Sequence, residues 1–124
     1  MNWIKFIIIV LAKSLYICYN FCYNLGYIKQ NYIWIEELLK GLDRKNADIT
    51  FSLHLFDRKE YWNLDLDNIK ETVRNGKIFI YKCEKPNKIC FKNYYGKENI
   101  TYNVIARYHK KHIEVVTAWP NKGR

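Results

Sequence analysis

The sequence has little of what metal hydrolases and nucleotide-binding enzymes need. Its 124 residues include only three histidines, no glycine-rich loop that could cradle a phosphate group, and no Gly-x-Ser-x-Gly nucleophile elbow. Asp65 and Asp67 lie two residues apart in a predicted turn, where one of them is expected to cap a helix rather than to bind a metal. We therefore predict no metal site and no cofactor, and an ordinary metal hydrolase is disfavoured.

The four cysteines form no zinc-binding pattern. They are spaced as Cys18-x-x-x-Cys22 and Cys83-x6-Cys90, and neither pair has the Cys-x-x-Cys spacing of a zinc knuckle. Cys83 and Cys90 have two interpretations, a cross-strand pair in a hairpin and two small buried apolar side chains, of which the second is favoured. Because no clear secretion signal is present, we expect a reducing compartment and a cytoplasmic protein.

Acidic residues are also scarce, and their scarcity is confined to one half of the chain. The sequence has 21 Lys and Arg against 12 Asp and Glu, a net charge of +9. Residues 1–76 carry a net charge of +1, whereas residues 77–124 hold 11 basic and 3 acidic side chains, a net charge of +8. This asymmetry favours an anionic partner, either nucleic acid or an acidic membrane surface. The alternative is a solvated basic surface without a partner.

Residues 1–30 differ from the rest of the chain because they are hydrophobic and aromatic. Residues 6–28 approach the length of about 20 mainly apolar residues that spans a bilayer, but one lysine and two asparagines interrupt them. Three interpretations stay open: a marginal membrane anchor, a hydrophobic helix that packs on the domain or on a partner, and upstream sequence from a wrongly chosen start codon. We therefore separate this segment from a basic domain over residues 31–124, and membrane association remains an alternative to a purely cytoplasmic location.

Three segments before Gly76 are predicted to be helical. Ser52 and Asp67 have the side-chain chemistry of N-caps for the second and third segments. Gly76 is expected to close the third helix as a C′ residue, the position that favours glycine. Residues 49–51 are interpreted as a short extended lead-in. The three helical segments are residues 34–42, 53–61 and 68–75.

After Gly76 the apolar residues recur with a period of two, which predicts strands. Tight turns containing Pro, Asn or Gly separate the four predicted strands. Their ranges are residues 77–83, 89–94, 101–108 and 112–119. The sequence therefore predicts an α+β domain of the order ααββββ, with two helices packed on a four-stranded antiparallel sheet and an extra hydrophobic helix at the N-terminus.

His54 and Arg58 are the first candidates for catalysis. Their i,i+4 spacing places them on the same face of the helix that begins after Ser52. An imidazole can move a proton while a guanidinium holds the oxygens of a phosphate, so the pair suits phosphate chemistry. A second interpretation is a histidine that caps the start of the helix beside a surface arginine.

The predicted strands supply a second set of candidates. Alternation along the third strand places Asn103, Ile105 and Arg107 on the face opposite Tyr102, Val104, Ala106 and Tyr108. Basic and aromatic side chains of the other strands are expected to gather near Arg107, where tyrosine offers a stacking face for RNA bases. An ordinary half-solvated sheet face carries similar residues. The candidate RNA-binding residues are Lys82, Lys92, Tyr94, Lys110 and Lys111.

Three stretches of residues 47–120 together resemble a known family. They are the H-x-x-x-R motif of residues 54–58, the Arg-Asn-Gly end of the helix at residues 74–76, and the closing strand IEVVTAWP at residues 113–120. The combination resembles a prokaryotic family of small domains of unknown function that look related to the BrnT and RelE types of toxin ribonuclease. The resemblance implies a compact α+β fold and an activity that cuts mRNA, often on the ribosome, with an antitoxin protein as partner. The family motif transfers only onto His54 and Arg58.

The leading hypothesis is a metal-independent endoribonuclease of the toxin type. In it, the 2′-hydroxyl of RNA attacks the adjacent phosphate, His54 acts as acid or base, and Arg58 and Arg107 stabilise the charged transition state. The first alternative is a non-catalytic nucleic-acid-binding module that uses the same surface. The second is a membrane-anchored domain in which residues 1–30 hold the chain at the bilayer and the basic face meets anionic phospholipids.

Overall fold

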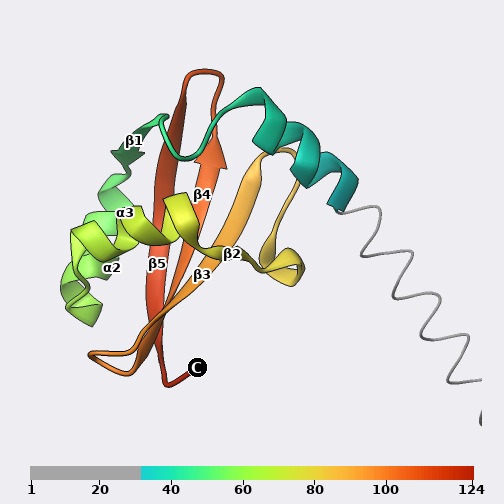
Figure 1. Cartoon of the computed structure of the whole chain (residues 1–124). Coiled ribbons are helices and arrows are strands. Elements are labelled where there is room, and N and C mark those ends of the chain that lie inside the picture. Colours follow the sequence, from blue (N-terminus) through green and yellow to red (C-terminus); the bar gives the residue numbers. More distant parts are fainter. Residues whose placement is uncertain (1–31) are drawn as a thin grey trace, which may run out of the picture. The chain divides into compact units, whose positions relative to one another are not determined.

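The computed structural model describes residues 32–124, of which Trp34–Arg124 form one compact unit (Figure 1). The predictions of an N-terminal hydrophobic helix, an anchor and a separate segment all concern residues 1–30, which lie outside the described residues. In the described part of the chain, no helix has the length and apolar character needed to cross a bilayer. The α+β class is confirmed for this part, but its arrangement differs from the expected one.

The sheet has five strands and is mixed, so the prediction of four antiparallel strands is wrong. The fifth strand, β1 (Asp48–Phe51), pairs in parallel with β5 at the edge of the sheet (Figure 1). β1 has only four residues, too few to show a strand period, and Val115, the Cα partner of Phe51, lies 64 residues beyond it in the chain. The strand order is β1-β5-β4-β3-β2, with β2 at Lys77–Ile78, β3 at Lys88–Tyr95, β4 at Ile100–Tyr108 and β5 at His112–Lys122.

The predicted strand over residues 77–83 is much shorter in the structure. β2 ends at Ile78, and a 3-10 helix follows at Ile80–Lys82. The amide of Phe79 still donates to the Cys90 carbonyl at 2.9 Å, but the next backbone bond runs from Lys82 to Phe79 and closes a turn. The Cys83 Sγ then accepts from the Cys90 amide at 3.4 Å, where a strand would supply a carbonyl. This turn removes the side-chain alternation that was expected beyond residue 79.

Three helical segments occur, as the sequence predicts, but the expected fold with only two helices is wrong. Residues 32–41 are helical, and α2 (Leu53–Trp62) and α3 (Leu66–Asn75) follow. Ser52 is confirmed as the N-cap of α2: its Oγ accepts from the Leu55 amide at 3.1 Å and donates to the Val116 carbonyl at 2.9 Å. The cap of α3 is Asp65 rather than Asp67, because the Asp65 carboxylate accepts from the Asp67 amide at 2.8 Å.

Gly76 ends α3, but not in the left-handed conformation expected of a C′ glycine. Its φ of −69° and ψ of 162° are extended, and its amide donates to the Thr72 carbonyl at 2.8 Å. A Cβ at this position would collide with the Thr72 carbonyl oxygen and would lie 2.9 Å from that of Lys92. Gly76 is therefore required by the close approach of α3 to β3 rather than by a positive φ.

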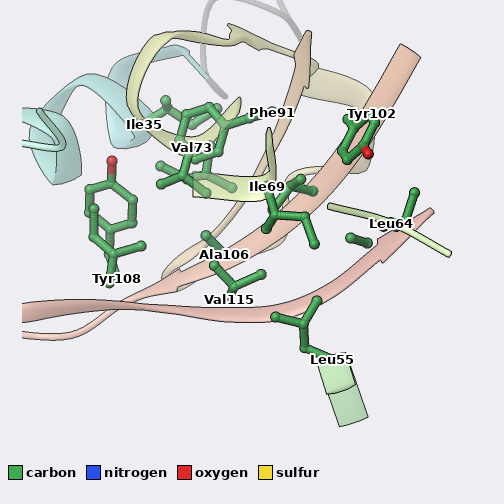
Figure 2. Packing of buried hydrophobic residues seen from close by; sticks show 14 residues of the cluster. Ile35, Leu55, Leu64, Ile69, Val73, Phe91, Tyr102, Ala106, Tyr108 and Val115 are labelled. Atoms are coloured by element: carbon green, nitrogen blue, oxygen red, sulfur yellow. The ribbon is translucent and has the colours of Figure 1, made fainter. Parts of the chain in front are cut away.

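The helices and the sheet enclose one core, which is confined to one face of the sheet (Figure 2). Leu55 of α2 packs against β5, while Ile69 and Val73 of α3 lie over β4 and β3. On β4 the buried side chains Val104 and Ala106 alternate with Ile105 and Arg107, which project from the other face. We call that other side, formed by the residues that alternate with the core, the open face.

Candidate nucleic-acid interface

A basic groove lies on the open face, where β2, β3 and the C-terminal residues meet. Its volume is about 540 Å³. Three of its lining residues are cationic, two are aromatic, and none is acidic. The cationic residues are Lys77, Lys92 and Arg124, and the aromatic residues are Phe79 and Tyr94. The groove therefore combines positive charge with flat ring surfaces, as the binding of an anionic, base-carrying ligand requires.

Three aromatic rings of this face each lie beside a cation. The Lys92 Nζ lies 3.8 Å from the centroid of the Phe79 ring, and the Arg124 guanidinium carbon lies 4.7 Å from that of Tyr94. Outside the groove, the Lys82 Nζ lies 5.8 Å from the centroid of the Trp119 ring. These cation–π contacts order the long basic side chains beside the rings.

Like charges face each other across the strands of the open face. Lys77 pairs with Lys92 between β2 and β3, and Lys88 pairs with Arg107 between β3 and β4. Directly opposed like charges on neighbouring strands destabilise a sheet by a few tenths of a kcal/mol. This repulsion is relieved when an anion binds between the two cations, which is the property expected of a phosphate-binding surface.

A second cluster lies on the open face beside the turn between β4 and β5. The Glu114 Oε1 is 3.1 Å from the His109 Nε2 and 3.6 Å from an Arg107 guanidinium nitrogen. The His109 and His112 rings stack with centroids 4.5 Å apart and planes 21° apart. Lys110 occupies the turn between the two histidines and is exposed, as is the next residue, Lys111. The cluster therefore brings two imidazoles, one carboxylate and several cations to one end of the face.

His54 and Arg58 lie together on the exposed surface of α2, as their spacing predicts. Ser52 caps this helix, so the interpretation of His54 as the cap is wrong. Neither side chain forms a hydrogen bond or an ion pair with any residue of the described range. The structure does not join Arg107 to this pair, because Arg107 projects from the open face and ion-pairs with Glu114.

The two described cysteines are both free thiols. Cys90 is fully buried and Cys83 is partly buried, which agrees with the expectation of small apolar side chains. Burial raises the pKa of Cys83, and burial together with the neighbouring Cys83 raises the pKa of Cys90 to about 12. Both thiols are therefore protonated at neutral pH and are poor nucleophiles. Within residues 32–124, no group of three or more His, Cys, Asp or Glu side chains is arranged to hold a metal ion.

Some predicted RNA-binding residues lie together and others do not. Lys92 and Tyr94 share the groove, and Lys82 lies over the Trp119 ring, whereas Lys110 and Lys111 lie at the turn between β4 and β5. Four groove and face residues were not predicted to bind, namely Lys77, Phe79, Trp119 and Arg124, and His109 and His112 were not predicted as a pair. Their basic and aromatic character was visible, but the register that joins them was not.

Comparison of the chain with family models, with curated proteins and with solved structures yields no match. The resemblance to toxin ribonucleases therefore stays a prediction from the sequence.

Proposed function

We propose that the protein binds single-stranded RNA on the open face of its sheet. The observation that carries this proposal is the groove in which Lys77 and Lys92 oppose each other. Lys92 lies over the Phe79 ring and Arg124 over the Tyr94 ring. Three cations without an acidic neighbour hold phosphate groups, and the rings stack on bases when their cations turn toward the phosphates.

The aromatic rings favour a single strand over a duplex. Stacking on a protein ring needs an unpaired base, and it contributes about 1–3 kcal/mol for each base. The rings of Phe79, Tyr94 and Trp119 are half-buried, and a sheet face that presents such rings is a known platform for stacking. Because Lys82 and Trp119 extend the same face beyond the groove, we expect the site to cover more than one nucleotide.

A second candidate function is the metal-independent endoribonuclease of the toxin type, with His54 and Arg58 as its catalytic pair. Both side chains lie on the same exposed side of α2, and neither forms a hydrogen bond or an ion pair with a described residue, which favours this function. In this proposal ribosome-bound mRNA is the substrate and an antitoxin protein is the partner. Attachment of the domain to a membrane is an alternative proposal that depends on residues 1–30.

The direct test measures the affinity of the full chain for a fluorescently labelled single-stranded RNA at several salt concentrations. The double variant Lys77→Ala/Lys92→Ala should bind about tenfold more weakly and lose about 0.7 of the log–log salt slope for each phosphate contact removed. Lys40→Ala, an exposed lysine on the helical side, is the matched control and should bind normally. Equal affinities and equal slopes for the double variant and the control would contradict the proposal.

A further inference from the structure

One histidine of the described chain is held by a carboxylate, and it lies on the open face. His109 Nε2 is 3.1 Å from Glu114 Oε1, and the same oxygen is 3.6 Å from the Arg107 guanidinium. A carboxylate only accepts hydrogen bonds, so the His109 Nε2 carries a proton in this contact. In the neutral ring the Nδ1 is then the unprotonated nitrogen. Glu114 thus positions His109 as a base, as a carboxylate positions the histidine of a catalytic triad.

A second histidine stands directly against the first. The rings of His109 and His112 are stacked at 4.5 Å, so a reacting group beside them is within reach of two imidazoles. One imidazole that accepts a proton and one that donates a proton are together sufficient for general acid–base catalysis.

The surroundings of the two rings carry charges of both signs. Arg107 on β4 ion-pairs with Glu114 on β5, and Lys110 and Lys111 come from the turn. Two further carboxylates are those of Glu37, which lines a pocket with His109 and Lys110, and Asp48, the Cα partner of His112. The three cations are placed to hold a phosphodiester and to stabilise the negative charge that develops on it.

We propose that His109 and His112 form an acid–base centre that cleaves the RNA bound on the open face, so this inference rests on the proposed function. His109 Nδ1 takes the proton of a ribose 2′-hydroxyl, whose oxygen forms a bond to the adjacent phosphorus. The bond from phosphorus to the 5′-oxygen breaks, and protonated His112 gives its proton to that oxygen. The products are a 2′,3′-cyclic phosphate and a 5′-hydroxyl, and no metal or redox partner takes part. Glu114 acts as a positioning residue, and Arg107 stabilises the phosphorane.

The centre differs from the His54 and Arg58 pair in its pH dependence. It needs one neutral and one protonated imidazole, so the cleavage rate should show a bell-shaped dependence on pH. Glu114→Gln should change the shape of this profile as well as its height, because it removes the charge that faces His109. A purely structural role of Glu114 would leave the profile unchanged.

The test incubates the full chain with a 5′-labelled single-stranded RNA in the presence of a chelator and measures binding and cleavage in the same samples. His109→Ala and His112→Ala should each lower the cleavage rate about 100-fold and change the affinity less than twofold. An RNA with one 2′-deoxyribose should not be cut after that sugar, and the product of ordinary RNA should end in a 2′,3′-cyclic phosphate. Lys40→Ala serves as the control with normal cleavage, and free imidazole should partly restore His109→Ala.

The outcomes separate this inference from the proposed function. RNA that binds and is not cut by the unaltered chain would overturn the acid–base centre and leave RNA binding in place. Cleavage that is lost in His54→Ala and full in His109→Ala would overturn it in favour of the α2 pair. Absence of binding at low salt would contradict the proposed function and the centre together.

Discussion

The two faces of the sheet are built from the same strands but differ in their charged residues and in the helices that cover only one of them. On the helix-covered face, Phe91, Val104 and Val115 are completely buried, and no charged residue belongs to this core. On the open face, the residues that alternate with them include Lys92 and Arg107, and like charges stand opposite each other. The first face stabilises the fold, whereas the second retains repulsion that an anionic ligand would relieve. The proposal of RNA binding on the open face rests on this contrast.

The largest predicted change in the free energy of unfolding comes from truncating a core side chain. Phe91→Ala should lower the free energy of unfolding by about 3–5 kcal/mol, because it removes a fully buried ring and leaves a cavity. Lys92→Ala, the next residue on β3, should change it by less than about 0.5 kcal/mol. Urea unfolding followed by circular dichroism measures both. Similar losses for the two variants would mean that the faces do not divide stability and binding between them.

The substitution Gly76→Ala tests the close approach of α3 to β3. Gly76→Ala should cost about 1–3 kcal/mol, because the new Cβ collides with the Thr72 and Lys92 carbonyls and forces α3 away from β3. Gly41→Ala is the matched control, since a Cβ there meets nothing within 4 Å. Urea midpoints of the two variants give the comparison, and equal midpoints would refute the close approach as the reason for Gly76.

Unfolding at alkaline pH tests the effect of burying the Cys90 thiol. The folded state holds the pKa of Cys90 at about 12, above its ordinary value of 9.0, because burial disfavours the thiolate. The raised pKa of Cys90 contributes to the free energy of unfolding. This contribution is fully present below pH 9 and is lost as the pH rises from 9 through 12. Between pH 8 and pH 11 the free energy of unfolding should fall by about 2–3 kcal/mol, and Cys90→Ala should show a smaller fall. A fall of the same size in Cys90→Ala would assign it to other groups such as Tyr108, whose pKa burial raises to about 12.

The smallest predicted change in stability is that of Lys77→Glu, which should change stability and RNA affinity in opposite directions. Lys77→Glu replaces a repulsive pair with Lys92 by an attractive one, so it should raise the free energy of unfolding by about 0.2–1 kcal/mol. The same change places a negative charge in the groove and should weaken RNA binding. Thermal unfolding and fluorescence anisotropy measure the two effects on one sample. A variant that is both less stable and unchanged in affinity would argue against the open face as a binding surface.

The parts of the fold that depend on neighbouring residues were predictable from the sequence. Ser52 caps its helix through an atom three residues away, and the alternation along β4 follows from its own period. Asp65 was missed in favour of Asp67 because both carboxylates have the right chemistry and only the backbone conformation decides. The extended conformation of residues 49–51 was predicted, but their pairing with β5 was missed because the partner strand is distant in the chain.

The candidate site shows the same limit. Lys92 and Tyr94 were placed together correctly because they lie two residues apart on one strand. Arg107 was expected beside them, but the register puts it opposite Lys88, where Glu114 binds it. Registers between strands and the turn after Phe79 arise from packing across the whole sheet. No local pattern in the sequence encodes them.

The most direct test of the account measures which lysines RNA protects from acetylation. The full chain is treated with an acetylating reagent with and without single-stranded RNA, and each lysine is quantified by mass spectrometry. The account predicts protection of Lys77, Lys82 and Lys92 on or beside the open face, with no protection of Lys40 and Lys59 on the helical side. Protection of the helical lysines, or equal protection of both sets, would contradict the assignment of RNA binding to the open face.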